Sequence, residues 1–168
     1  MKAYLFFLAA SLAHTTVGLA QKISKKEVPT AVCATFTSRF PTVKAVSWEK
    51  ESHPVKAAYE YETHNDFWAR EAFLNQEEYE ASFQLNGQQM SVVITPDGIV
   101  QETETEMTAS QLPPSILALL ARNFNACRIS EAARIVKADG SILYEAEVAL
   151  AGRKQDILFT ADGLQTAE

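Results

Sequence analysis

The residues best able to bind a metal or act as a base lie in one short stretch of the chain. His53 and His64 are the only histidines after residue 20, and Glu62 and Asp66 accompany them. On a strand, Glu62 and His64 would share one face about 6.5 Å apart, which suits a bridging site better than one tetrahedral zinc centre. Solvated loop residues explain this group more simply, so we assign no metal ligands.

Nucleophilic catalysis has little support in the sequence. A nucleophile needs a base within hydrogen-bond reach and a group that orients the base. The chain has no Gly-x-Ser-x-Gly motif. Cys33 lies in an apolar helical stripe, without the basic or helix-terminal setting that makes a thiolate. We expect no enzymatic activity and no cofactor.

The two cysteines, Cys33 and Cys127, leave a disulfide open. An oxidising compartment allows them to pair. A buried free thiol, however, also serves as a small hydrophobic side chain. We favour two free thiols.

Acidic residues set the charge of the chain, whose formal net charge is -6. An acidic protein repels phosphate backbones, so nucleic acid is not an expected partner. Glu102, Glu104 and Glu106 form a one-sided row on a predicted strand. We expect this strand to lie at an edge of the sheet, where a row of charges discourages aggregation with another sheet.

Aromatic residues gather between positions 48 and 73. Trp and Tyr are enriched at binding hot spots, but they also fill small β cores. Both interpretations stay open. Our candidate partner-binding residues from this group are Tyr59, Tyr61, Phe67 and Trp68.

The elements that must position these residues are predicted by an internal repeat. Tyr79–Gly98 and Tyr144–Gly163 align without a gap at an offset of 65, with eight identities in twenty positions. Each copy reads as a strand, a glycine turn, a second strand and an Asp-Gly turn. The repeat therefore predicts two antiparallel meanders.

A helix should precede each meander. The first is predicted from Val32, Phe36 and Phe40, which are four residues apart, and it opens after Val28-Pro29. Leu112-Pro113-Pro114 opens the second, where proline costs nothing because the first helical N–H groups have no partner. Its stripe consists of Ile116, Leu117, Leu120 and Phe124.

Strand alternation separates the two faces of the predicted sheet. Val43–Glu49 and Ile129–Lys137 should be the first strands of the two units. In the meanders, alternate residues such as Tyr79 and Phe83 should face the helices, and the opposite face should be wet. Val93 and Leu158 are apolar residues on this open face, which makes them candidate partner-binding residues.

The two halves differ by an insertion at about residues 53–75. Equivalent residues of the two halves are 84 positions apart in the helices but only 65 apart in the meanders. The first half is therefore about 19 residues longer between its helix and its meander. The insertion reads either as an added hairpin or as a strand followed by a short helix. Any function particular to this protein should involve it.

The first twenty residues have the pattern of a signal peptide. Lys2 precedes the apolar run Ala3–Ala13, and small residues at Gly18 and Ala20 suit cleavage before Gln21. An apolar run of eleven is too short to cross a bilayer, which needs about 20 residues. We expect a periplasmic or secreted protein with no membrane span.

The order of motifs resembles that of the PepSY-like, β-lactamase-inhibitor-like proteins of bacterial envelopes. The shared signs include the opening Val-Pro, a strand ending in Trp-Glu, two Tyr-Glu-Ala segments and the closing Asp-Gly turns. The resemblance covers about residues 27–163. It implies two helix-plus-sheet units side by side and a non-enzymatic binding or inhibitory role outside the cytoplasm, and it carries over no functional residues.

Together these observations predict an α+β protein built from two tandem helix-plus-antiparallel-meander units that form one sheet with the helices on one face. The expected divisions are a signal peptide at 1–20, a first unit at 21–108 and a second unit at 109–168. The expected function is binding of a protein partner in the cell envelope, with inhibition of an envelope protein or protease as one form of it. The alternative is a small-molecule or metal-ion carrier that uses the insertion.

The insertion aromatics generate the first testable prediction. Trp68→Ala or Tyr61→Ala should weaken partner capture by ~1–3 kcal/mol and leave the free energy of unfolding nearly unchanged. Binding assays and denaturant titrations on the same variants separate the two interpretations. A loss of stability of several kcal/mol would make these residues core instead.

Overall fold

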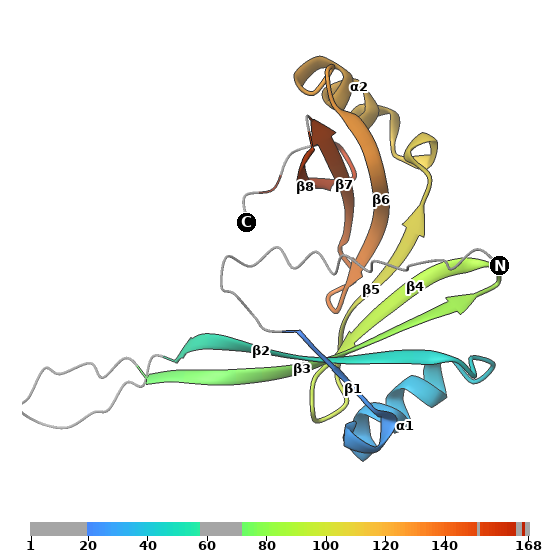
Figure 1. Cartoon of the computed structure of the whole chain (residues 1–168), viewed down its shortest axis with the longest axis vertical. Coiled ribbons are helices and arrows are strands. Elements are labelled where there is room, and N and C mark those ends of the chain that lie inside the picture. Colours follow the sequence, from blue (N-terminus) through green and yellow to red (C-terminus); the bar gives the residue numbers. More distant parts are fainter. Residues whose placement is uncertain (1–19, 58–71, 151, 164–165, 167–168) are drawn as a thin grey trace, which may run out of the picture.

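The computed structural model describes residues 20–57, 72–150, 152–163 and 166. The side chains of residues 53–57, 72–75 and 150 lie outside this description. In the described residues, eight strands form one antiparallel sheet in chain order (Figure 1). The strands are β1 (Gln21–Ile23), β2 (Val46–Ala57), β3 (Ala72–Leu85), β4 (Gln88–Ile94), β5 (Val100–Met107), β6 (Arg128–Lys137), β7 (Ile142–Leu150) and β8 (Arg153–Thr160). The helices are α1 (Thr30–Arg39) and α2 (Pro114–Asn123), with 3-10 turns η1 (Lys25–Glu27) and η2 (Ala109–Gln111) before them. The predicted α+β class is confirmed.

Both α-helices begin and end in the same way. Pro29 and Pro113 are the N-cap residues, and proline fixes a φ that suits a helix start. At the other end, the N–H of Phe40 donates to the Phe36 carbonyl at 2.8 Å, and that of Phe124 donates to Leu120 at 2.8 Å. Val32, Phe36, Ile116 and Leu120 are the buried residues of the two helices. Four members of the predicted apolar stripes are therefore the ones that pack on the sheet.

The entry to each helix is held by a capping box around the preceding 3-10 turn. The N–H of Ser24 donates to the Glu27 carboxylate at 2.8 Å, and that of Thr108 donates to Gln111 Oε1 at 2.7 Å. Each interaction satisfies a backbone donor that the turn leaves free. The same device at both places fixes how the chain leaves a strand and enters a helix.

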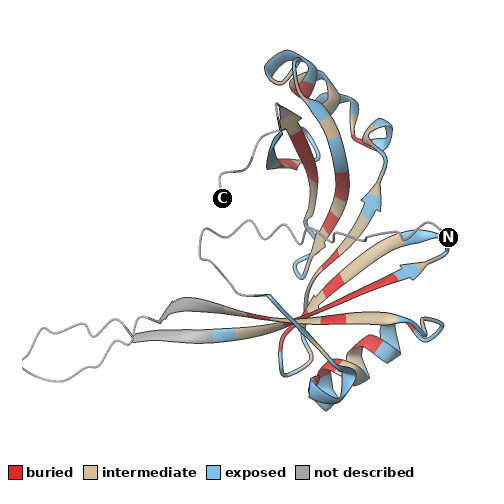
Figure 2. Ribbon diagram, in the orientation of Figure 1, coloured by how far each residue is buried: buried red, intermediate tan, exposed pale blue. Residues whose placement is uncertain are grey.

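The core lies between the helices and one face of the sheet, in two clusters. In the first, Phe36 of α1 packs edge-on against Trp48 of β2, with ring centroids 5.3 Å apart. In the second, Ile116 and Leu120 of α2 pack with Ala146 and Phe159 of the last two strands. Figure 2 shows buried residues on the helices and on the strands of both halves.

The two segments that share sequence pair in the same register. Tyr79 lies opposite Ile94 in the hairpin of β3 and β4, and Tyr144 lies opposite Phe159 in the hairpin of β7 and β8. Adding 65 to both residue numbers of the first pair gives the second pair. Both segments are hairpins of one sheet, as the sequence predicts.

The long hairpin of β2 and β3 corrects two expectations. β2 begins at Val46 instead of Val43, because the N–H of Val43 donates to the Phe40 carbonyl at 3.2 Å and keeps this part of the chain in a turn. Residues 53–57 pair with residues 72–76, so the insertion lengthens these two strands. The hairpin interpretation holds for these arms, and the helix interpretation is wrong for residues 72–75. The segment 58–71 lies outside the described residues.

The carboxylate row on β5 does not protect a sheet edge. β5 pairs with β4 on one side and with β6 on the other. It is the fifth strand of eight, so the edge-strand explanation for Glu102, Glu104 and Glu106 is wrong. Another reason is needed for three carboxylates in the middle of a sheet.

Both cysteines are free thiols, as we favoured.

Among the described residues, no helix is long and apolar enough to cross a membrane.

The packing of the two helices can be tested one at a time. Phe36→Ala and Leu120→Ala should each lower the free energy of unfolding by ~2–5 kcal/mol, because each removes a large side chain from a closed core. Denaturant unfolding measures both. An unchanged midpoint for either variant would mean that its helix is not packed on the sheet.

Candidate functional site

The candidate site is the face of the sheet that lies opposite the helices, which we call the concave face. Strand register defines it. One row across the strands joins Glu49, Glu80, Val93, Glu102 and Lys137. A second row joins Ser47, Ser82, Ser91, Glu104, Ile135, Leu143 and Thr160. The sheet curls away from the helices, so this face lies inside the bend (Figure 1).

Acidic side chains dominate the concave face. The acidic residues that strand register places on it are Glu49, Glu51, Glu78, Glu80, Glu102, Glu104, Glu106, Glu131, Glu145, Glu147 and Asp156. The basic ones are Lys22, Arg128, Lys137 and Lys154. Glu49 lies directly opposite Glu80, and Glu51 opposite Glu78. Like charges in such pairs destabilise a sheet, so the fold alone does not favour this arrangement.

Two lysines offset part of this charge. Lys137 forms an ion pair with Glu102 of the neighbouring strand. Lys154 lies 2.8 Å from the Glu147 carboxylate and 3.8 Å from that of Glu131. These contacts lie along β5–β6 and at the β8 end of the sheet. On β2, Glu49 lies opposite Lys22 of β1 on the same face.

Burial and crowding keep protons on two central carboxylates. Desolvation raises the pKa of Glu80 to about 7, with further contributions from the charges of Glu51, Glu49 and Glu102. Desolvation also raises the pKa of Glu104 to about 8, assisted first by Glu145. Glu102 acts on Glu80, and Glu145 acts on Glu104, from two strands away, as expected on the inside of a bend. Glu49 and Glu51 lie on the strand next to Glu80. Near neutral pH, part of this surface is therefore protonated.

The expectation of a wet open face is wrong. Glu80 is only 7% exposed and Glu147 only 4%. Figure 2 shows buried and half-buried residues along the strands of the bent sheet. A bent sheet brings the side chains on its inner face closer together than a flat sheet does, which accounts for the burial of these carboxylates. Alternation in the sequence predicts which face a residue lies on, but not how far the sheet bends.

The predicted partner-binding residues are brought together only in part. Val93 and Leu158 both lie half-buried on the concave face, as predicted, but on β4 and β8. Val93 lies opposite Glu80 and Glu102, and Leu158 lies opposite Glu145. Tyr59, Tyr61, Phe67 and Trp68 lie outside the described residues.

Sequence reasoning missed the buried carboxylates. A signal was available, because Glu80 and Glu145 are the Glu of the two Tyr-Glu-Ala segments, 65 residues apart. Both are buried on the concave face. An acidic residue at the same strand position in both copies indicated that the face has a special chemistry.

The carboxylates of the concave face that the structure describes do not form a metal site. Within the described parts of the chain, no group of three His, Cys, Asp or Glu side chains is arranged to hold a metal ion. The side chains of His53, Glu62, His64 and Asp66 lie outside the description, so the preference for a solvated loop stays a prediction.

Comparison with known proteins shows the fold. No protein-family model matches the sequence, and no curated protein matches it. A DUF2874 family protein from Bacteroides uniformis superposes with a TM-score of 0.60 at 20% identity, covering 82% of this chain and 85% of that one. A BLIP-like protein from Bacteroides fragilis superposes with a TM-score of 0.56 at 20% identity, covering 82% of this chain and 83% of that one. A proposed periplasmic protein from Bacteroides eggerthii superposes with a TM-score of 0.61 at 19% identity, covering 82% of this chain and 85% of that one. This chain therefore has the fold that these Bacteroides proteins share.

The raised pKa of Glu80 predicts how stability depends on pH. The folded state holds this proton up to about pH 7, whereas the unfolded chain releases it near the ordinary glutamate pKa of 4.5. The free energy of unfolding should therefore fall as pH rises from about 4.5 to about 7. Glu80→Gln should remove this loss and raise stability at pH 8 by on the order of 1–3 kcal/mol, with little effect at pH 4.

Denaturant unfolding at several pH values measures this effect. Glu106→Gln is the matched control, because Glu106 lies on the same face but is exposed. Equal pH dependence in the wild type and in Glu80→Gln would show that Glu80 ionises normally in the folded protein.

Proposed function

We propose that this protein is a non-enzymatic binding protein of the cell envelope that captures a protein partner on its concave face. The observation that carries the proposal is one sheet face that runs across both halves of the molecule while both helices pack on the other face. Inhibition is one consequence of capture, because a partner whose active surface is covered cannot bind its substrate. The shared fold with a BLIP-like protein supports this direction.

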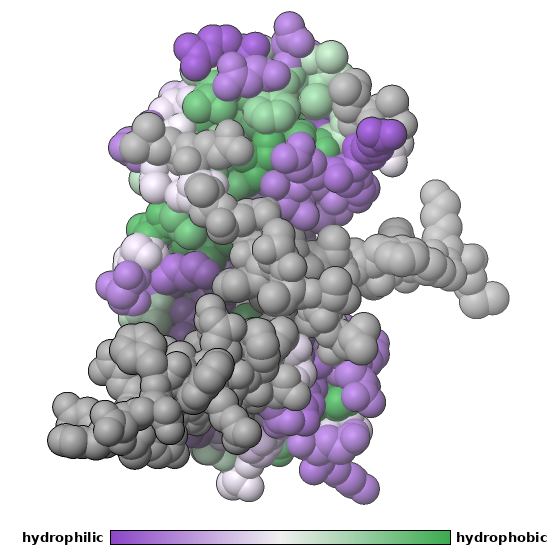
Figure 3. Space-filling view, turned by 90° about the vertical axis from the view of Figure 1, so that its left-hand side faces the viewer, coloured by the Kyte–Doolittle hydropathy of each residue, from purple (hydrophilic) through white to green (hydrophobic). Residues whose placement is uncertain are grey.

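The chemistry of the face favours a partner with a basic surface. In the strand register, apolar groups such as Val93 and Leu158 lie among carboxylates, a mixture that suits a docking surface. Figure 3 shows hydrophobic and hydrophilic residues side by side where the described residues are visible on this side of the molecule. Cross-strand pairs of like charge, such as Glu49 with Glu80, cost stability in the free protein. A cationic partner would relieve this repulsion and would also be steered toward the face before contact.

The remaining sequence predictions belong to the same proposal. We propose that residues 1–20 are a signal peptide removed before Gln21, which delivers the protein to the periplasm or the exterior. The two halves, 21–108 and 109–168, are tandem units; the matched register of their hairpins supports this. Tyr59, Tyr61, Phe67 and Trp68, which lie outside the described residues, are proposed to contact the same partner.

The docking face can be tested by placing charge on its apolar residues. Val93→Arg and Leu158→Arg should each weaken partner capture by ~2 kcal/mol or more, because each adds a bulky cation to a surface proposed to receive cations. The measurement is quantitative recovery of the same captured protein from a native envelope extract, followed by its affinity for each purified variant.

Ile99→Arg is the matched control. Ile99 is a large apolar residue that is 55% exposed and lies in the turn between β4 and β5. It should bind the partner as the wild type does. Undiminished capture by both concave-face variants, with all three variants folded, would contradict docking on this face.

A further inference from the structure

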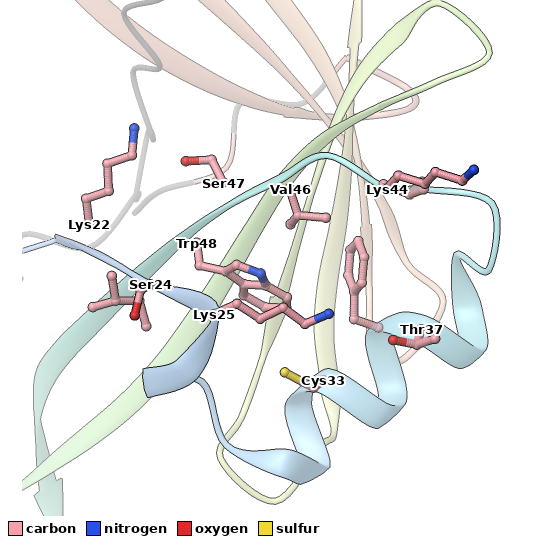
Figure 4. Close-up of a pocket in the computed structure, with 12 residues that line it drawn as sticks. Lys22, Ser24, Lys25, Cys33, Thr37, Lys44, Val46, Ser47 and Trp48 are labelled. Carbon is pink, nitrogen blue, oxygen red and sulfur yellow. The ribbon is translucent and has the colours of Figure 1, made fainter.

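A cavity of about 430 Å³ lies on the helix side of the first half, away from the concave face. It opens where β1 ends and the chain turns through η1, and α1 and the start of β2 form its walls (Figure 4). Ligand sites for small molecules generally begin at about 300 Å³. The cavity is therefore large enough for a small organic molecule.

The inner wall of the cavity is apolar and aromatic. Trp48 and Phe36 are both almost fully buried, and their rings meet edge to face with centroids 5.3 Å apart. Val46 and Cys33 are half-buried beside them, and the Cys33 thiol points toward Trp48 in Figure 4. Such a wall binds hydrocarbon or an aromatic ring better than it binds water.

The opening of the cavity is positively charged. Lys25 reaches beneath Trp48 toward Cys33 (Figure 4). Lys44 points away from the cavity, and Lys22, which strand register places on the concave face, extends on the other side of β1 and β2. None of these lysines forms an ion pair with another described residue, and no acidic residue lines the cavity. In a chain with net charge -6, a cavity that has the ammonium group of Lys25 and no carboxylate in its lining favours an anion.

The second half of the chain shows that helix packing does not require these groups. A shift of 84 residues carries α1 onto α2. The same shift carries Lys25 to Ala109 and Thr37 to Ala121. Cys33 becomes Leu117, which is larger and packs against the second core cluster. The small Cys33 and the charge of Lys25 are therefore particular to the first half.

We propose that this cavity binds a small amphipathic anion, such as a medium-chain carboxylate. The apolar body lies against Trp48, Phe36 and Cys33, and the carboxylate lies at the ammonium group of Lys25. The hydroxyl of Thr37 lies at the same opening and can donate to the anion (Figure 4). This site is separate from the proposed docking face and does not depend on it.

Calorimetric titration of the purified protein with decanoate, kept below its micelle concentration, tests the site. Saturable binding of one decanoate per chain is expected, with no binding of decyltrimethylammonium. Lys25→Glu should weaken binding about tenfold or more, because a like charge replaces an attractive one. Lys26→Glu is the matched control and should bind normally, because the exposed Lys26 does not line the cavity. Equal weakening in both variants, or no saturable binding by the wild type, would overturn the proposal.

Two further measurements place the ligand. Cys33→Leu should reduce decanoate binding while the protein keeps its melting temperature, because leucine fills the space as Leu117 does in the second half. Decanoate should also slow alkylation of Cys33 by iodoacetamide without slowing that of Cys127, as resolved by mass spectrometry. An unchanged rate at Cys33 in the presence of saturating decanoate would show that the ligand binds elsewhere.

Discussion

The alternation of side chains across one continuous sheet is the constraint on which the rest of the structure depends. Each strand must give its apolar residues to the face that the helices cover, since only that face can build a core. Trp48, Ala81 and Val92 meet α1 in this way, and Ala132, Ala146 and Ile157 meet α2. The other face is thereby left free of core packing, and its residues are free to serve binding.

That freedom is used in an unusual way. Carboxylates are placed opposite one another on neighbouring strands, and the curl of the sheet brings Glu104 within the electrostatic influence of Glu80 and Glu145. Burial then makes ionisation costly, so the free protein is less stable at neutral pH than the same sheet with amides there would be. A sheet face that costs stability in the free protein is better explained by the proposed partner than by the fold alone.

Local patterns predicted much of the fold, and curvature limited the rest. Proline at the helix start and four-residue apolar spacing identified both helices, because these signals act within one turn of helix. The repeat identified the hairpins and their register. Alternation placed Val93 and Leu158 on the correct face, but it could not show that Glu80 is buried, because bending depends on all eight strands. The row at Glu102–Glu106 was misjudged for the same reason: strand order decides whether a strand is an edge.

Carboxyl footprinting of the complex tests the central claim most directly. Carbodiimide labelling with glycine ethyl ester, read by mass spectrometry, reports the solvent access of each carboxylate with and without the captured partner. The account predicts that the partner protects half-buried concave-face carboxylates such as Glu49 and Glu102, while the exposed Asp97 and Asp139 in turns label as before. Unchanged labelling of the concave face in a saturated complex would contradict it.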